Sequence, residues 1–272
     1  MDKIAIISDI HGNITALEAV IADIEKRNIN KIYCLGDSIV KSCNSDLVID
    51  LIREKCDVIV KGNCDEAMSR PDIPKGKFWT RDLIGDERAS FIHNLPISYD
   101  FYLSGYLIRL FHSSPFGLDY IYNPVFSNEN TIYSATEISN PLDLFENTEF
   151  LGKGPNDPIP DIVGYGHIQS PNILRIQNKT IFNPGSVGMP IEMLNNDFYD
   201  KTNKFSTVAS YIILEGELNS RELSSISFNL VRLPYDIEKE IELIKKSSVP
   251  NKDKLIFELR SATNYYMRKE EI

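Results

Sequence analysis

Short apolar runs alternate with longer amphipathic segments over the first hundred residues of the chain. The run at 3–8 is rich in β-branched residues, and the apolar positions at 14–24 that follow it recur at helical spacing. Similar runs at 31–35 and 57–60 are predicted strands, and a helical pattern at 45–55 lies between them. This order predicts parallel strands that are joined by right-handed helical crossovers.

In the second half of the chain, runs of strand length follow one another with turn residues between them. Two of these runs flank Ser104 and Gly105, which predicts a hairpin at that point. The last segment, 236–268, has two helical patterns with a break near Val249 and Pro250. Further strand-length runs occupy 161–165, 172–177, 180–183, 207–215 and 225–233.

These patterns predict an α/β protein in which two sheets pack on each other with helices outside them. We expect a single domain over 1–272, with a helical tail at 236–268. The stretches 70–82 and 113–158 are the least regular and are rich in proline, asparagine and aromatic residues. We interpret them as insertions that serve either as surface loops or as a lid or wall for a substrate.

Side chains that can bind metals follow the ends of the predicted strands. The carboxyl ends of the strands are the edge at which open α/β sheets bind ligands, so we expect these side chains to meet there. A mixed set of oxygen and nitrogen donors suits Mn²⁺, Fe or Zn²⁺. A carboxylate shared between two such ions holds a metal pair, and metal pairs clamp phosphoryl groups. The residues are Asp9, His11, Asp37, Asn63, His112 and His167.

Composition limits the partners of such a site. The formal net charge of −10 argues against a nucleic-acid polymer or an anionic membrane, because both favour basic surfaces. A small phosphorylated substrate is compatible if a metal supplies positive charge. The sequence has no apolar run of membrane-spanning length, no signal-peptide pattern at its start and no C-x-x-C pair among its four cysteines. We therefore expect a cytoplasmic protein with reduced thiols.

Six short motifs resemble, in the same order, those of the calcineurin-like metallophosphoesterases. They are SDIHGN (8–13), GDSIV (36–40), KGNCDEA (61–67), FHSSP (111–115), GYGHIQSP (164–171) and FNPGSVGMP (182–190). The resemblance is nearest to the YfcE-like bacterial branch, which includes phosphodiesterases that cleave diadenosine tetraphosphate asymmetrically. It implies a four-layer α/β/β/α sandwich and a phosphodiesterase that hydrolyses nucleotide-type substrates such as dinucleoside polyphosphates.

The resemblance assigns metal-binding roles to the residues at the strand ends. Asp9 and His11 would bind the first of two divalent ions, and Asp37 would bridge both ions. Mn²⁺ is the expected metal, with Fe or Zn²⁺ as alternatives. The ligands of the second ion would be Asn63, His112 and His167.

The same resemblance implies how catalysis would proceed. A hydroxide held between the two ions would attack phosphorus in line with the leaving oxygen. Asp37, Asn63 and His112 would be the catalytic residues, and Asn63 would also orient the phosphate. Asn13, the last residue of the first motif, either contacts the phosphate or caps the helix that follows it.

The chain departs from the family pattern at Gln169, where most relatives carry a second histidine that binds the first metal. An amide oxygen can bind a hard cation but is a weaker donor than imidazole. Gln169 therefore either coordinates through its oxygen or leaves room for a water. In both cases we expect the first metal site to be the weaker of the two.

A second departure is Cys64, at a position where many relatives carry a histidine that protonates the leaving group. A cysteine is a poor acid there, so we expect leaving groups that depart as anions. The alternative is that Cys64 is a small buried apolar residue. A third departure is the segment 38–41, which lacks the Asp-Arg-Gly motif of protein serine/threonine phosphatases and symmetric dinucleotide hydrolases.

Two other functions are compatible with the same fold. One is a phosphomonoesterase, and the other is a catalytically weak binding or scaffold module, such as the small subunit of retromer. A scaffold has no need of a nearly complete set of metal ligands, so the strand-end residues favour the enzyme. The sequence does not specify an oligomeric state or the physiological substrate.

Overall fold

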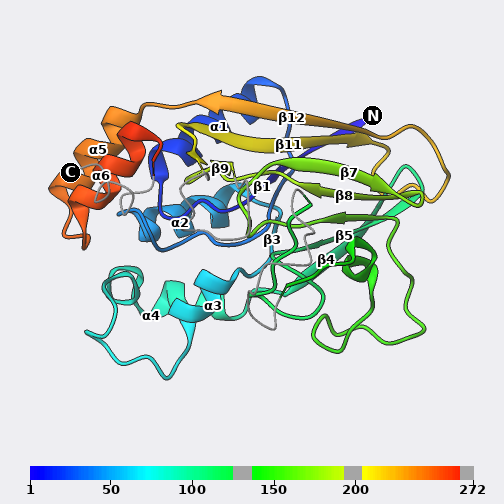
Figure 1. The fold of residues 1–272 in the computed structure, drawn as a ribbon, viewed down its shortest axis with the longest axis horizontal. Coiled ribbons are helices and arrows are strands. Elements are labelled where there is room, and N and C mark those ends of the chain that lie inside the picture. The colour runs from blue at the N-terminus through cyan, green and yellow to red at the C-terminus, as the bar shows by residue number, and fades with distance from the viewer. Residues whose placement is uncertain (125–136, 193–203, 264–272) are drawn as a thin grey trace.

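Two five-stranded sheets pack face to face in the computed structural model, which describes residues 1–124, 137–192 and 204–263 (Figure 1). The predicted α/β class with two mixed sheets is confirmed. The strands of the first sheet are, in order, β12 (Ser227–Pro234), β11 (Val208–Gly216), β1 (Asp2–Ile7), β2 (Ile32–Cys34) and β3 (Val58–Ile59). Those of the second are β4 (Ser98–Leu103), β5 (Tyr106–Phe111), β6 (Ile162–Gly164), β8 (Lys179–Asn183) and β7 (Asn172–Ile176).

The parallel strands predicted for the first half of the chain are present. β1 pairs with β2 and β2 with β3 in parallel, and the helices α1 (Ile14–Lys26) and α2 (Ser45–Lys55) connect them. The predicted hairpin is also confirmed, since β4 and β5 are antiparallel on either side of Ser104 and Gly105. In the second sheet, β5, β6 and β8 are parallel.

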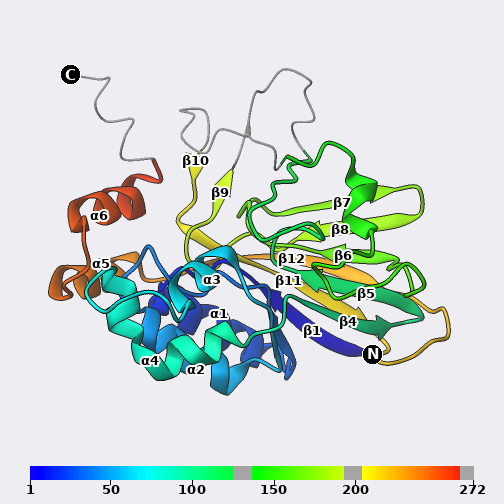
Figure 2. The same cartoon turned by 90° about the horizontal axis from the view of Figure 1, so that it is seen from below.

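The central strand β1 is buried on both faces, which explains its continuous apolar sequence. Ile4 and Ile6 belong to the apolar layer between the two sheets, together with Phe101 of the second sheet. Ala5 and Ile7 lie on the opposite face and pack in the layer formed with α1 and α2. Figure 2 shows these helices on the side of the first sheet that faces away from the second.

The outer face of the second sheet packs against described residues of the predicted insertion at 113–158. Its described residues include the 3-10 helix η1 (Pro141–Phe145), whose Leu144 and Phe145 pack in one cluster with Phe111 of β5. This insertion therefore carries part of the hydrophobic core. Residues 125–136 of the insertion lie outside the described residues.

Arg109 of β5 is fully buried between the second sheet and this insertion. Its guanidinium donates to both carboxylate oxygens of Asp100, at 2.9 and 3.0 Å, and to the amide oxygen of Asn147 at 2.9 Å. Lys153 lies 3.0 Å from the same carboxylate. The pair Asp100–Arg109 thus links the insertion to the sheet beneath it.

The predicted helical tail consists of α5 (Ile237–Lys246) and α6 (Lys252–Ser261), with the break where it was expected; residues 264–268 lie outside the described residues. Both helices lie at one end of the molecule, where α5 packs against α1 and α6 packs against α5 (Figures 1 and 2). Glu240 of α5 is fully buried and accepts hydrogen bonds from the hydroxyls of Thr15 at 2.7 Å and Ser42 at 2.5 Å. The tail is therefore bound to α1 and to the loop after β2.

The remaining elements are α3 (Asn63–Ser69), α4 (Trp79–His93), β9 (Ile191–Glu192) and β10 (Lys204–Phe205). The predicted insertion at 70–82 ends in the first turn of α4. None of the helices among the described residues has the length and apolar character needed to cross a membrane.

Candidate active site

The candidate site lies where the carboxyl ends of five strands from both sheets meet. Three of these strands are the parallel β1, β2 and β3 of the first sheet, and two are the parallel β5 and β6 of the second. The structure brings all the predicted strand-end residues together there, and Gln169 with them. They are Asp9, His11, Asp37, Asn63, His112 and His167.

Several residues of the site have a left-handed backbone that non-glycine residues rarely adopt. Among them are Asp9 (φ 53°), Asp37 (φ 51°) and His167 (φ 64°). Hydrogen bonds between the loops sustain these conformations, such as Asp9 N to Gly36 O at 3.0 Å. Such strained positions cluster at functional sites, where the surrounding structure holds side chains in a required direction.

Asp37 divides the site into two groups of side chains. Its Oδ2 lies 3.8 Å from Nε2 of His11, and its Oδ1 lies 3.5 Å from Nε2 of His112. Nε2 of His11 is also 3.7 Å from Oδ1 of Asp9. We call Asp9, His11 and Gln169 the first group. One carboxylate thus faces both groups, which is the arrangement that a bridging ligand requires.

The second group consists of Asn63, His112 and His167. Oδ1 of Asn63 lies 3.0 Å from Nε2 of His112 and 3.2 Å from Nδ1 of His167. Nδ1 of His112 lies 2.7 Å from the carbonyl oxygen of Leu35, so a proton on Nδ1 leaves the Nε2 lone pair directed into the site. This orientation is typical of histidines that bind metals.

The donor atoms of the site fit a divalent cation. Within the described part of the chain, Oδ1 of Asp9 is buried and has no hydrogen-bond partner, whereas Oδ2 accepts from Ser8 Oγ at 2.6 Å and from His167 N at 3.1 Å. Asp9, Asp37 and His112 place one ligand atom each within 4.8 Å of one another, and so do His11, Asp37 and Cys64. An unsatisfied buried carboxylate oxygen is costly unless a cation balances it.

The protonation of the site also suits metal binding. Burial, followed by the charge of Lys41, lowers the pKa of His11 to about 3, and burial, followed by His112, lowers the pKa of His167 to about 3. Both imidazoles are therefore neutral near pH 7 and can offer lone pairs. Burial opposes ionisation of Asp37, but the positive charges that His112 and His11 carry when protonated hold its pKa below the ordinary value. Burial raises the pKa of Asp9 to about 6.

Asp65 and Cys64 lie beside the ligands. The carboxylate of Asp65 accepts from Ser38 N at 3.0 Å and from Gly62 N at 3.1 Å, so it binds the loops after β2 and β3 to each other. The backbone N–H of Cys64 donates to Oδ1 of Asp37 at 2.8 Å. Burial raises the pKa of the Cys64 thiol well above its ordinary value, which makes this thiol a poor proton donor to a leaving group at neutral pH.

Asn13 is the N-cap of α1, one of the two roles that the sequence suggested. Its Oδ1 accepts from Ala16 N at 3.0 Å, and its Nδ2 donates to Gly188 O and to Tyr235 Oη, both at 3.1 Å. A contact with phosphate stays a prediction. Asn13→Ala is expected to lower the free energy of unfolding by about 1–2 kcal/mol, because a cap and two further hydrogen bonds are lost.

Urea denaturation of the wild type and of Asn13→Ala measures this effect, and the kinetic constants of the variant separate the two roles. If Asn13 acts as a cap, kcat and KM change little while stability falls. A KM that rises tenfold or more at unchanged stability would instead assign Asn13 to phosphate binding.

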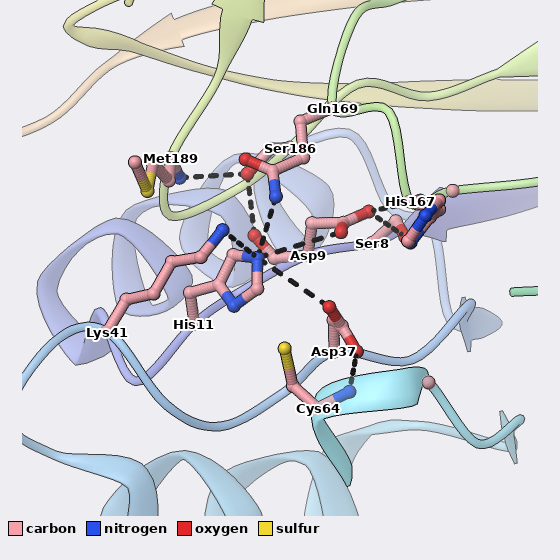
Figure 3. A network of polar contacts seen from close by, with 12 residues as sticks. Ser8, Asp9, His11, Asp37, Lys41, Cys64, His167, Gln169, Ser186 and Met189 are labelled. Carbon is pink, nitrogen blue, oxygen red and sulfur yellow. Dashed lines mark hydrogen bonds and ion pairs between the residues drawn. The ribbon is translucent and has the colours of Figure 1, made fainter. Parts of the chain in front are cut away.

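Lys41 belongs to the site although the sequence did not indicate it as a site residue. Its Nζ lies 3.0 Å from Nε2 of His11. In Figure 3, contacts from Lys41, Gln169, Asp9 and Asp37 all converge on this one ring nitrogen. The residue follows Asp37 by four positions in a loop without regular structure, so no periodicity indicates where its side chain points.

The comparison with known proteins agrees with this geometry. Residues 2–199 match the model of the calcineurin-like phosphoesterase superfamily domain. The chain belongs to this superfamily. It is 28% identical to the uncharacterized protein MJ0912 of Methanocaldococcus jannaschii over 268 residues, which are 91% of this chain and 93% of that protein.

Two solved structures share the fold of this superfamily member over nearly its whole length. A metallophosphoesterase from Sphaerobacter thermophilus is 21% identical, with a TM-score of 0.65, and the match covers 96% of this chain and 99% of that one. The hypothetical protein PH1004 from Pyrococcus horikoshii OT3 is 17% identical, with a TM-score of 0.62, covering 95% and 98%. The metallophosphoesterase fold expected from the motifs is therefore confirmed.

Proposed function

We propose that the protein is a metal-dependent phosphodiesterase that hydrolyses nucleotide-type phosphodiesters or dinucleoside polyphosphates. The observation that carries this proposal is the shared position of Asp37 between two groups of buried donors beside an unsatisfied carboxylate oxygen of Asp9. A divalent ion held there, with Mn²⁺ as the first choice, would supply Lewis acidity toward a phosphoryl oxygen and a nucleophilic oxygen at neutral pH. The expected cytoplasmic location and the YfcE-like branch are parts of the same proposal.

The chain's own residues have the following roles in this proposal. Asp37, Asn63 and His112 form the part of the site where the reacting phosphoryl group would lie, and the amide of Asn63 orients it. The neutral His11 and His167 present lone pairs rather than protons. The Cys64 thiol would be a poor general acid for the leaving group, since burial raises its pKa. Leaving groups that depart as anions are therefore favoured.

A diester is favoured over a monoester because hollows flank the site on two sides. One recess is mostly apolar and extends from His11 and Lys41 to α5 and α6; its apolar wall includes Met189, Pro190, Ile244, Leu255 and Leu259. The other begins at Asn63 and Cys64 and is lined by Glu66 and Arg70. A phosphodiester has a substituent on each side of phosphorus, and an apolar recess suits a nucleobase.

The test is a hydrolysis assay with metal analysis. The protein is purified without chelator, and its metals are counted. It is then assayed with Mn²⁺ on bis-nitrophenyl phosphate, mono-nitrophenyl phosphate and diadenosine tetraphosphate. We expect bound metal, hydrolysis that stops on chelation and returns with Mn²⁺, and higher kcat/KM for the diesters.

The other functions predict different results in the same assay. Preference for mono-nitrophenyl phosphate would assign the protein to the phosphomonoesterases. No tightly bound metal together with no hydrolysis of any of the three substrates would contradict the enzyme and support a scaffold module.

A further inference from the structure

The ammonium group of Lys41, a cation supplied by the chain itself, lies against the first group of the candidate site. Nζ of Lys41 lies 3.0 Å from Nε2 of His11, the atom that would bind the first metal. Nδ1 of His11 lies 3.2 Å from the carbonyl oxygen of Ile39, so a proton on Nδ1 makes Nε2 an acceptor. The Lys41 ammonium then donates to the lone pair that a metal would need.

The amide of Gln169 also lies against the ammonium group of Lys41. In the orientation of Figure 3 its nitrogen faces Nε2 of His11 at 2.8 Å. When the amide is turned by 180°, its nitrogen donates to Met189 O at 2.6 Å and its oxygen lies 2.9 Å from Nζ of Lys41. This second orientation satisfies both ends of the amide. The oxygen of Gln169 then accepts from the ammonium group of Lys41 and lies 2.8 Å from Nε2 of His11, which donates to the same oxygen in the tautomer that carries its proton on Nε2.

The loop that carries Lys41 is fixed in an unusual conformation. Val40 (φ 72°) and Lys41 (φ 65°) both have a left-handed backbone, which is particularly unfavourable for the β-branched valine. Hydrogen bonds hold both sides of the pair, from Val40 N to Ser45 Oγ at 3.1 Å and from Ser42 N to His11 O at 2.9 Å. Ser42 is also bound to the buried Glu240 of α5 at 2.5 Å. The fold thus sustains a strained loop that directs Lys41 into the site.

A divalent ion and an ammonium group cannot share the same acceptors, because like charges at contact distance repel strongly in a buried site. The second group has no such competitor among the described contacts: Oδ1 of Asp37 lies 3.5 Å and Oδ1 of Asn63 lies 3.0 Å from Nε2 of His112. Asp9 of the first group also places an oxygen within 4.8 Å of ligand atoms of Asp37 and His112. The second group can therefore hold a divalent ion, whereas the acceptors of the first group already bind the ammonium group of Lys41.

We propose that the ammonium group of Lys41 takes the place of the first metal ion, so that the protein binds one divalent ion per chain rather than a pair. This inference rests on the proposed function, since it concerns the same site. The single ion lies with Asp37, Asn63, His112 and His167 and within reach of Asp9, while Lys41, His11 and Gln169 form a fixed positive centre beside it. A phosphodiester then meets one metal and one lysine instead of two metals.

The test is metal stoichiometry with Mn²⁺ added to chelator-treated protein. Metal content per chain is measured after gel filtration, and electron paramagnetic resonance distinguishes an isolated Mn²⁺ from an exchange-coupled pair. The variants are Lys41→Met, Gln169→His and both together. Lys246→Met, which removes an exposed lysine of α5 outside the site, is the matched control.

We expect one isolated Mn²⁺ per chain in the wild type, in Gln169→His and in Lys246→Met. The double variant should bind a second Mn²⁺ at least about a hundredfold more tightly than the wild type does, with a coupled signal, because the competing charge is gone. Two coupled ions in the wild type would overturn the inference and leave the proposed function intact. Loss of all metal in Lys41→Met, with folding unchanged by circular dichroism, would instead make Lys41 a ligand and also overturn it.

Absence of any bound metal in the folded wild type would contradict the proposed function itself, and the inference with it. The wild-type measurement decides the stoichiometry even if a variant does not fold. The two failures are therefore distinguishable in one experiment.

Discussion

Asp37→Asn is expected to abolish both metal binding and phosphodiesterase activity. Asparagine keeps the shape of Asp37 and tolerates its left-handed backbone, but it removes the carboxylate whose oxygens lie 3.8 Å from His11 and 3.5 Å from His112. Loss of the metal forfeits several kcal/mol of transition-state stabilisation, and a factor of ten in rate corresponds to about 1.4 kcal/mol. We therefore expect kcat/KM to fall by about a thousandfold or more.

Metal analysis and steady-state kinetics on bis-nitrophenyl phosphate measure the two effects together. Asp253→Asn is the matched control, because it removes an exposed carboxylate of α6 that is not among the residues of the site or of the apolar recess. Thermal unfolding of the chelator-treated proteins shows whether the fold persists. If Asp37→Asn retained its metal and more than a tenth of the wild-type activity, Asp37 would not be a ligand.

The largest expected effect on stability comes from Asp100→Ala. Arg109 is fully buried and gives two hydrogen bonds to Asp100, so the substitution leaves a buried guanidinium with only part of its partners. Removal of one partner from this buried ion pair costs about 3 kcal/mol of stability. The loss is smaller than for a fully enclosed pair, because the Asp100 carboxylate is 20% exposed. We expect the free energy of unfolding in urea to fall by this amount at pH 7.

The effect of Asp100 should depend on pH in a defined direction. Burial alone would raise the pKa of Asp100, but hydrogen bonds from Arg109 and Lys153 lower it below its ordinary value of 3.8. A carboxyl with a lowered pKa in the folded state stabilises the protein fully above the unfolded pKa and loses this contribution as the pH falls through the folded pKa. The difference between wild type and Asp100→Ala should therefore shrink below about pH 4.

A double variant separates the pair from the single residue. Asp100→Ala with Arg109→Met removes both charges and keeps apolar volume, so it should be more stable than Asp100→Ala alone. A loss of less than 1 kcal/mol in Asp100→Ala, or a double variant that is less stable than the single one, would contradict the assigned role of this pair.

Local patterns predicted most of the secondary structure because each element repeats its own periodicity. The apolar spacing of 45–55 predicted a helix, and α2 spans those residues. The break near Val249 likewise separates α5 from α6. The insertion at 113–158 was harder to interpret, since its irregular composition does not indicate that η1 adds Leu144 and Phe145 to the core beside the second sheet.

The candidate ligands could be predicted from sequence because a general rule relates them to the fold. Parallel strands end at the same edge, so residues after β1, β2 and β3 meet without any knowledge of side-chain contacts. No such rule predicts where the side chain of Lys41 lies. Its contact with His11 joins two loops that follow different strands, and its direction depends on the left-handed Val40 and on hydrogen bonds to Ser45 and His11.

The sequence by itself thus determined the order of strands and helices, the class of fold and the residue types collected at the sheet edge, because periodicity and strand-end position are local properties. Only the tertiary structure decided that Asp37 faces two groups and that Lys41 and Gln169 meet at one nitrogen of His11. These contacts join positions as far apart as 11 and 169, and their distances follow from how the two sheets pack. Whether a metal ion or the ammonium group of Lys41 lies against Nε2 of His11 is therefore a property of the folded chain.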